Sequence, residues 1–137
     1  MTKYIFTDTS ALIAVLNKKD QYHDKAAATF HSILNGPSSL LITSHIFAET
    51  LTRIARRVSQ QAAITAGARI RNEARIAMVT PTHEALDQAW EIFQSYHDQQ
   101  FSFVDCISFA VMREMDLSRA FSFDKHFQIM GFESIEE

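Results

Sequence analysis

The feature that most constrains the fold is the alternation of short β-prone runs with amphipathic helical segments along the chain. This alternation is typical of parallel βαβ units, whose sheet is covered by helices on both faces. We predict an α/β fold in one domain over residues 1–137. The expected strands are 3–7, 39–43, 75–79, 119–123 and 132–135. The expected helices are 10–17, 21–34, one from about 44, then 60–72, 82–97, 103–115 and 126–130.

Composition excludes several classes of protein. The 137 residues include only three glycines, two prolines and one cysteine, Cys106. A disulfide framework, a turn-rich β-sandwich and a glycine-rich phosphate loop are therefore ruled out. No apolar run approaches the roughly 20 residues of a membrane helix, and the N-terminus lacks the pattern of a signal peptide. We expect a soluble, cytoplasmic protein with no membrane partner.

Positive charge is concentrated in one segment of an otherwise acidic chain. The net charge is −3, yet six of the eight arginines and a single acid, Glu73, lie between Thr50 and His83. That segment carries six minus one, or +5, and the rest carries −8. Such asymmetry predicts a phosphate-binding face, although two solvated helices would give the same pattern. The six arginines are Arg53, Arg56, Arg57, Arg69, Arg71 and Arg75.

Four acidic residues are placed where ligands bind in α/β proteins. Asp8, Glu49 and Asp124 each follow an expected strand, and Asp105 lies in the apolar helix 103–115. The carboxyl ends of parallel strands meet at one edge of a sheet, so we expect these acids to converge. A carboxylate in an apolar helix is costly to bury unpaired. Converging carboxylates favour a hard divalent cation, which in turn favours phosphodiester cleavage.

Each acid also has a purely structural explanation. Asp8 and Asp124 precede expected helices and could cap them. Glu49 could form an ion pair with the arginine four residues along its helix. Asp105 could complete a capping box with Ser102. Of the four, Asp105 is explained least well in this way.

The order and spacing of these motifs resemble the PIN-domain ribonucleases, and among them the VapC-type toxins of toxin–antitoxin modules. The resemblance runs from Tyr4 to Gly131. Three blocks carry it: IFTDTSALIAVL around Asp8, SHIFAETLTRIARR around Glu49, and FSFVDCISFAVMREMDLSRAFSFDKHF around Asp105 and Asp124. It implies a three-layer α/β/α fold, with a parallel sheet of four or five strands and about seven helices.

The same resemblance implies an Mg²⁺- or Mn²⁺-dependent endoribonuclease, a homodimer and a cognate antitoxin. It makes four acids both catalytic residues and metal ligands: Asp8, Glu49, Asp105 and Asp124. It gives supporting roles to three small polar residues: Thr9, Ser10 and Ser122. A stand-alone PIN nuclease in RNA processing, or a PIN module that binds RNA or protein without cleaving it, is the alternative.

The residues add two further expectations. Arg53 and Arg56 follow Glu49 by one and two helical turns on nearly the same face, so we predict that they bind RNA and lead it to the acids. The alanine-rich helix 60–72 permits close packing, so we expect the helices between Ser44 and Asn72 to form the dimer interface.

Other readings of the sequence are weaker. A phospho-receiver domain needs paired acids after its first strand, and a haloacid-dehalogenase phosphatase needs Asp where Ser10 stands. The start of a zinc-protease motif at His83-Glu84 has Asp87 where the second histidine is required. Isolated histidines are expected to be packed or solvated: His31, His83, His97 and His126. Most phenylalanines are expected in the core, including Phe6, Phe103, Phe109 and Phe123, with the Phe101/Phe103 pair as the one candidate for the site.

Overall fold

The computed structural model describes residues 3–135 and has the predicted α/β architecture. Five strands form one parallel sheet: β1 (Lys3–Thr7), β2 (Ser38–Thr43), β3 (Ile76–Val79), β4 (Arg119–Phe121) and β5 (Glu133–Ile135). Within this range there are seven helices: α1 (Thr9–Leu16), α2 (His23–Leu34), α3 (Ser44–Arg57), α4 (Gln60–Asn72), α5 (His83–Ser95), α6 (Phe103–Glu114) and α7 (His126–Ile129). The predicted three-layer fold is confirmed.

The strand order, β3-β2-β1-β4-β5, places β1 at the centre of the sheet. The chain first runs outward from β1 to β2 and β3, and then returns to build β4 and β5 on the other side. The direction of winding therefore reverses between β1 and β4. In open parallel sheets, ligands bind in the crevice outside the carboxyl ends of the strands at such a point. This edge is where the site is expected.

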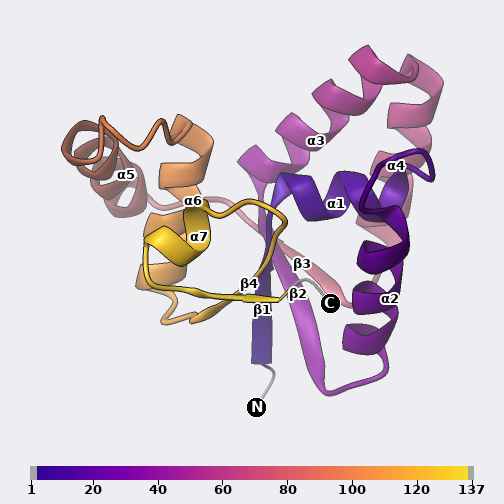
Figure 1. The fold of residues 1–137 in the computed structure, drawn as a ribbon, viewed down its shortest axis with the longest axis horizontal. Coiled ribbons are helices and arrows are strands. Elements are labelled where there is room, and N and C mark those ends of the chain that lie inside the picture. Colours follow the sequence, from indigo (N-terminus) through magenta and orange to yellow (C-terminus); the bar gives the residue numbers. More distant parts are fainter. Residues whose placement is uncertain (1–2, 136–137) are drawn as a thin grey trace.

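Strand side chains alternate between the two faces, and each face is covered by its own helices. Ile5 and Leu40 pack with α1 and α2 on one face. Phe6 and Leu41 belong to the core shared with α5, α6 and α7 on the other. All four side chains are buried. The helices on the two sides of the sheet form the outer layers of the fold (Figure 1).

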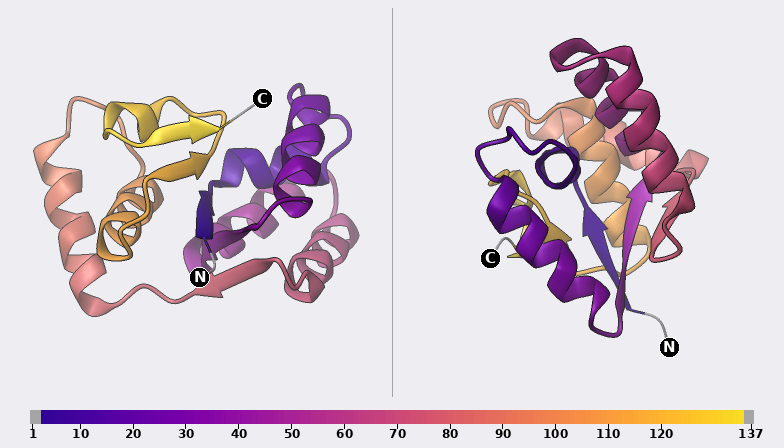
Figure 2. Two further views of the ribbon diagram at one scale, coloured as in Figure 1. Left: turned by 90° about the horizontal axis from the view of Figure 1, so that it is seen from below. Right: turned by 90° about the vertical axis from the view of Figure 1, so that its right-hand side faces the viewer.

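Helices α3 and α4 form an antiparallel pair that extends beyond the carboxyl edge of the sheet (Figure 2, right). Gly67 allows the close approach, because a Cβ built there would lie 3.2 Å from Leu51 Cδ1. In the half of the pair nearer the turn between α3 and α4, Ala63 and Ala66 pack with Ile54 of α3 and Ile13 of α1. The pair is therefore anchored to the helix that begins at Asp8.

One arginine of the basic segment has a structural role. The Arg75 guanidinium donates hydrogen bonds to the carbonyls of Leu34, Gly36 and Ser38 and to the Ser39 hydroxyl. It thus fastens the start of β3 to the turn that leads into β2. The expectation that all six arginines are available to phosphate is wrong for this residue.

Helix α5 buries small and aliphatic side chains and leaves two of its aromatic rings exposed. Ala85, Ala89 and Ile92 are buried, whereas Trp90 and Phe93 are exposed.

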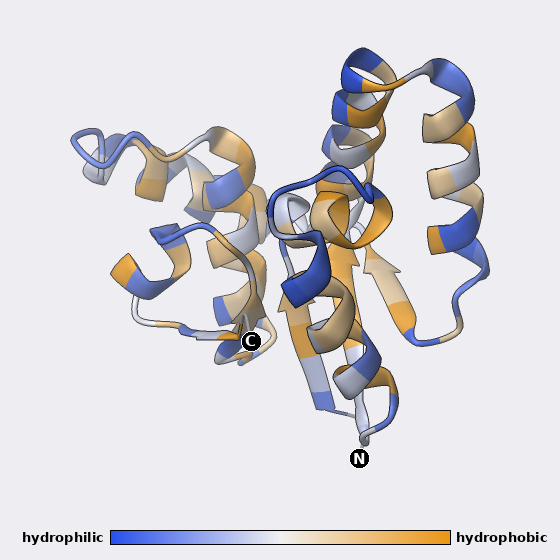
Figure 3. Cartoon of the chain, turned by 45° about the vertical axis from the view of Figure 1, so that its right-hand side comes forward, coloured by the Kyte–Doolittle hydropathy of each residue, from blue (hydrophilic) through white to orange (hydrophobic). Residues whose placement is uncertain are grey.

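In Figure 3 the strands of the sheet are mostly hydrophobic, while the loop between α1 and α2 is hydrophilic. No helix within residues 3–135 combines the length and the apolar character that crossing a membrane requires.

Candidate active site

Asp8 sits at the centre of the site, at the carboxyl end of β1. It occupies the N-cap position of α1, but its carboxylate serves another purpose. Oδ2 accepts hydrogen bonds from the hydroxyls of Ser10, at 3.1 Å, and Ser122, at 3.0 Å. The side chain is almost completely buried. The capping explanation offered by the sequence is therefore not what holds this carboxylate in place.

The two supporting serines join β1 to the loop after β4. Each donates its hydroxyl proton to Asp8 and accepts a backbone N–H from the loop after β4: Ser10 from Phe123, at 3.1 Å, and Ser122 from Asp124, at 2.9 Å. The strand ends at Phe121 because the chain turns here to make these bonds. This turn brings Asp124 to the same edge of the sheet as Asp8.

Asp105 combines both roles that the sequence left open. It forms a capping box at the start of α6, accepting the Ser102 N–H at Oδ2, at 3.0 Å, while the Ser102 hydroxyl accepts the Asp105 N–H. The same Oδ2 lies 2.9 Å from Nδ1 of His126. The helix start therefore fixes a carboxylate that also faces the site.

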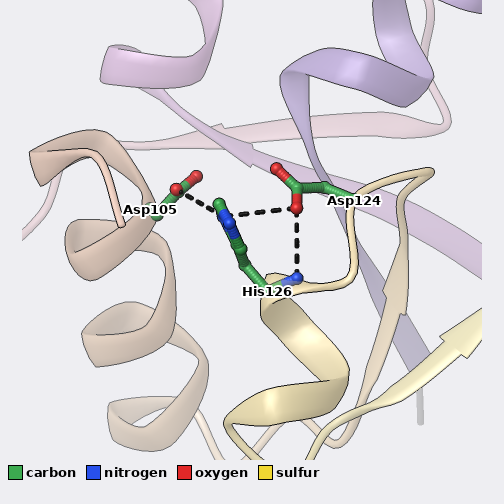
Figure 4. A group of neighbouring side chains, drawn as sticks. All are labelled: Asp105, Asp124 and His126. Carbon is green, nitrogen blue, oxygen red and sulfur yellow. Dashed lines mark hydrogen bonds and ion pairs between the residues drawn. The ribbon is translucent and has the colours of Figure 1, made fainter. Parts of the chain in front are cut away.

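His126 joins Asp105 to Asp124 and was missed by sequence reasoning. Its Nδ1 lies 3.2 Å from Asp124 Oδ1, and its backbone N–H donates to that oxygen at 3.1 Å (Figure 4). The expectation that His126 is an ordinary packed or solvated histidine is wrong. Its position two residues after Asp124, at the start of α7, was the available signal.

These three side chains are the closest set of metal-type ligands within the described part of the chain. Asp105, Asp124 and His126 each offer one ligand atom, and these atoms lie within 4.8 Å of one another. Asp8 and Glu49 stand outside this group. Two carboxylates and an imidazole are a donor set that suits a divalent cation, and carboxylate oxygens are the donors that Mg²⁺ and Mn²⁺ prefer.

Glu49 reaches the site through α1. Its Oε1 accepts a hydrogen bond from the Thr9 hydroxyl at 2.5 Å, which ties it to the residue next to Asp8. Its Oε2 lies 3.5 Å from the Arg53 guanidinium, so the ion pair suggested by the sequence is also present. Exposed pairs of this kind contribute little to stability. The Thr9 contact is the one that ties Glu49 to the start of α1, next to Asp8.

Burial, with a smaller contribution from neighbouring carboxylates, raises the pKa values of two of the acids. Burial, followed by repulsion from Asp105, raises the pKa of Asp8 from 3.8 to about 6. Burial is also the main cause that raises the pKa of Asp105; Asp124 adds to it, and the Ser102 and His126 hydrogen bonds oppose it. Positive charge placed among these groups would favour the ionised carboxylates. The residues present therefore fit a bound cation.

An open groove of about 560 Å³ lies beside the cluster. Asp124 and His126 line it together with Arg53 and Arg57 of α3. Arg56 is exposed on the same helix but is not among the described residues that line this groove. The groove therefore contains two guanidinium groups as well as Asp124 of the acidic cluster.

Comparison with known proteins agrees with this geometry. The model of the family described as PIN domain matches residues 5–133. The chain belongs to the PIN-domain family. It is 36% identical, over 129 residues, to the 23S rRNA-specific endonuclease VapC20 of Mycobacterium tuberculosis, an alignment that covers 93% of this chain and 95% of that protein. The resemblance to VapC-type toxins is therefore confirmed.

Solved structures of PIN-domain proteins extend the likeness to three dimensions. The crystal structure of M. tuberculosis VapC20, described as a sarcin–ricin loop cleaving toxin, matches with a TM-score of 0.88 and 33% identity, over 97% of this chain and 99% of that one. VapBC2 from Rickettsia felis matches with a TM-score of 0.73 at 10% identity, covering 98% of each chain. At such low identity the second match speaks for the fold alone.

Proposed function

We propose that this PIN-domain protein is a divalent-metal-dependent endoribonuclease of the VapC type. The observation that carries the proposal is the convergence of Asp8, Asp105 and Asp124 at the carboxyl edge of the sheet, with raised pKa values for the first two. Glu49 completes the acidic set through Thr9. The 36% identity to an endonuclease over nearly the whole chain supports the same activity.

In this proposal the acids hold Mg²⁺ or Mn²⁺, with His126 as an additional ligand or as the partner that orients Asp105 and Asp124. When bound, the cation polarises the phosphate and activates water for attack on phosphorus. Ser10 and Ser122 hold Asp8 in a fixed position, and Thr9 does the same for Glu49. Such fixed carboxylates need little rearrangement during the reaction.

The proposed substrate follows from the relative. VapC20 of M. tuberculosis is described as specific for 23S rRNA and as cleaving the sarcin–ricin loop. We propose the same loop as substrate and an antitoxin as protein partner, the latter because VapBC complexes have this fold. The homodimer built on helices between Ser44 and Asn72 stays a prediction.

The test of this function is cleavage of bacterial ribosomes and of a synthetic hairpin with the sarcin–ricin sequence. We expect a single cut in the loop when Mg²⁺ or Mn²⁺ is present and none in EDTA, with the cut mapped by end-labelling. The relative rates in the two metals identify the better cofactor. Cleavage that persists in EDTA, or intact RNA with both metals, would contradict the proposal.

The arginines of the groove give a second prediction. We expect Arg53→Gln and Arg57→Gln each to weaken RNA binding similarly across sequences, because their contacts are to phosphates. Each lost phosphate contact should reduce the slope of log affinity against log salt by roughly 0.7 for single-stranded RNA. Binding is measured from roughly 50 to 200 mM salt, a range wide enough to determine the slope of log affinity against log salt.

Arg56→Gln is the matched comparison on the same helix. The sequence favours Arg56 as the second RNA contact, whereas the groove favours Arg57. A salt slope that changes only in the Arg53 and Arg57 variants supports the groove as the path of the RNA. If the Arg53 and Arg57 variants both had the wild-type salt slope, these residues would not bind RNA and would belong to a solvated or protein-binding face.

A further inference from the structure

A stacked pair of aromatic rings lies beside the carboxylates. Tyr22, at the turn before α2, and Phe123, which directly precedes Asp124, have ring centroids 4.7 Å apart and planes inclined by only 2°. The planes of the other aromatic pairs are inclined more steeply, from 24° in Phe109–Phe132 to 83° in Phe93–Phe103. The expectation that Phe123 belongs to the hydrophobic core is therefore only half right, since the ring also lines the groove.

The outer ring of this pair is open to solvent. Tyr22 is 40% exposed although one of its faces lies on Phe123, which is half-buried. The exposed surface of Tyr22 is therefore its other face and its edges. An exposed ring held parallel to a second ring is a preformed stacking surface, because little side-chain freedom remains to be lost when a third ring is added.

Positive side chains line the two hollows next to the pair. Tyr22 and Phe123 line the groove that holds Arg53 and Arg57, and they also line a smaller hollow of about 190 Å³ that contains Lys25 and Lys125. The two rings line both hollows, as do Asp124 and Lys125, so the rings lie close to cationic side chains and to an acid of the site. Proteins that bind single-stranded nucleic acid combine cations along the backbone path with aromatic rings that stack on bases.

We propose that the Tyr22–Phe123 pair is a nucleobase platform that makes the enzyme select an unpaired nucleotide next to the cleaved phosphate. The proposal rests on the function proposed above. The base stacks on the open face of Tyr22, and the flanking phosphates lie toward Arg53 and Arg57 in the groove and Lys25 and Lys125 in the smaller hollow. Phe123 precedes Asp124 in the chain, so this nucleotide lies at the cut. A base stacked within a duplex cannot reach the platform, so loops and single strands are preferred.

The experiment combines a substitution of Tyr22 in the protein with the removal of single bases from the RNA. Once the wild-type cut is mapped, each nucleotide around it is replaced in turn by an abasic residue, and binding is measured in an Asp105→Asn background, in which cleavage is slow compared with binding. We expect Tyr22→Leu to weaken binding on the order of tenfold, and Tyr22→Phe to bind like the parent protein. Trp90→Leu removes another exposed ring, on α5, and is the control.

The decisive result is non-additivity. With Tyr22 present, one abasic position should weaken binding about as much as Tyr22→Leu does; in the Tyr22→Leu protein the same abasic position should have no further effect. Unchanged affinity in Tyr22→Leu, independent additive losses, or an abasic scan of the parent protein without a sensitive position would each overturn the platform. The abasic scan needs no variant at position 22, so it is decisive even if Tyr22→Leu folds poorly. Failure of the proposed nuclease function is seen earlier and separately, as the lack of any mapped cut with wild-type protein.

Discussion

Asp105→Asn is expected to reduce RNA cleavage by about a hundredfold or more while the protein stays folded. Removing one preorganised charged group from a site that stabilises a developing charge typically costs a factor of about 10²–10³. Asp105 is linked to Asp124 through His126 and repels Asp8, so it is the residue that connects the cluster. The measurement is the initial rate of cleavage of the mapped RNA with saturating Mn²⁺.

The fold should survive because Asn retains what the helix start requires. An Asn side-chain oxygen can still accept the Ser102 N–H that closes the capping box. Asp98→Asn, in the exposed turn after α5, is the matched control and should keep full activity. Circular dichroism should be unchanged in both proteins. Cleavage at the wild-type rate in a folded Asp105→Asn protein would remove Asp105 from the proposed site.

Asp8→Asn is expected to stabilise the metal-free protein at neutral pH and to leave it unchanged in acid. The pKa of Asp8 is about 6 in the folded protein, against an ordinary value of 3.8. Between these values the folded protein holds a proton that the unfolded chain has lost, so the free energy of unfolding falls as the pH rises. Above pH 6 the full cost of the buried charge remains, about 3 kcal/mol. Asn carries no charge and avoids that cost.

Thermal unfolding in EDTA at two pH values measures this effect. At about pH 7.5 we expect Asp8→Asn to raise Tm on the order of 10 °C, and at about pH 4 to change it little. Adding Mn²⁺ should stabilise the wild type more than the variant, because the proposed ligand is missing in the variant. Asp87→Asn, an exposed substitution on α5, should have no effect at either pH. Destabilisation of Asp8→Asn at neutral pH would contradict the assignment of a strained buried charge.

Much of the fold could be predicted because hydrophobic periodicity is local. The helix expected at 60–72 is α4, and the strand expected at 39–43 is β2 with one more residue at its start. The strand expected at 119–123 is shorter, because Ser122 and Phe123 leave the sheet to bond to residues that follow β1. Such a boundary depends on a contact with a segment more than 100 residues away, and no window of sequence contains it.

The sequence by itself determined that strands alternate with helices and that an acid follows three of the strands. Only the tertiary structure decided which of these groups meet. The strand order places β4 beside β1, which brings Ser122 and Phe123 to the residues that follow β1. The packing of the helices and loops places His126 between Asp105 and Asp124 and puts Tyr22 on Phe123. It also leaves Arg57 rather than Arg56 in the groove. The physical reason is that periodicity fixes which face of each element is buried, whereas the neighbours of a polar side chain depend on how distant elements are packed together.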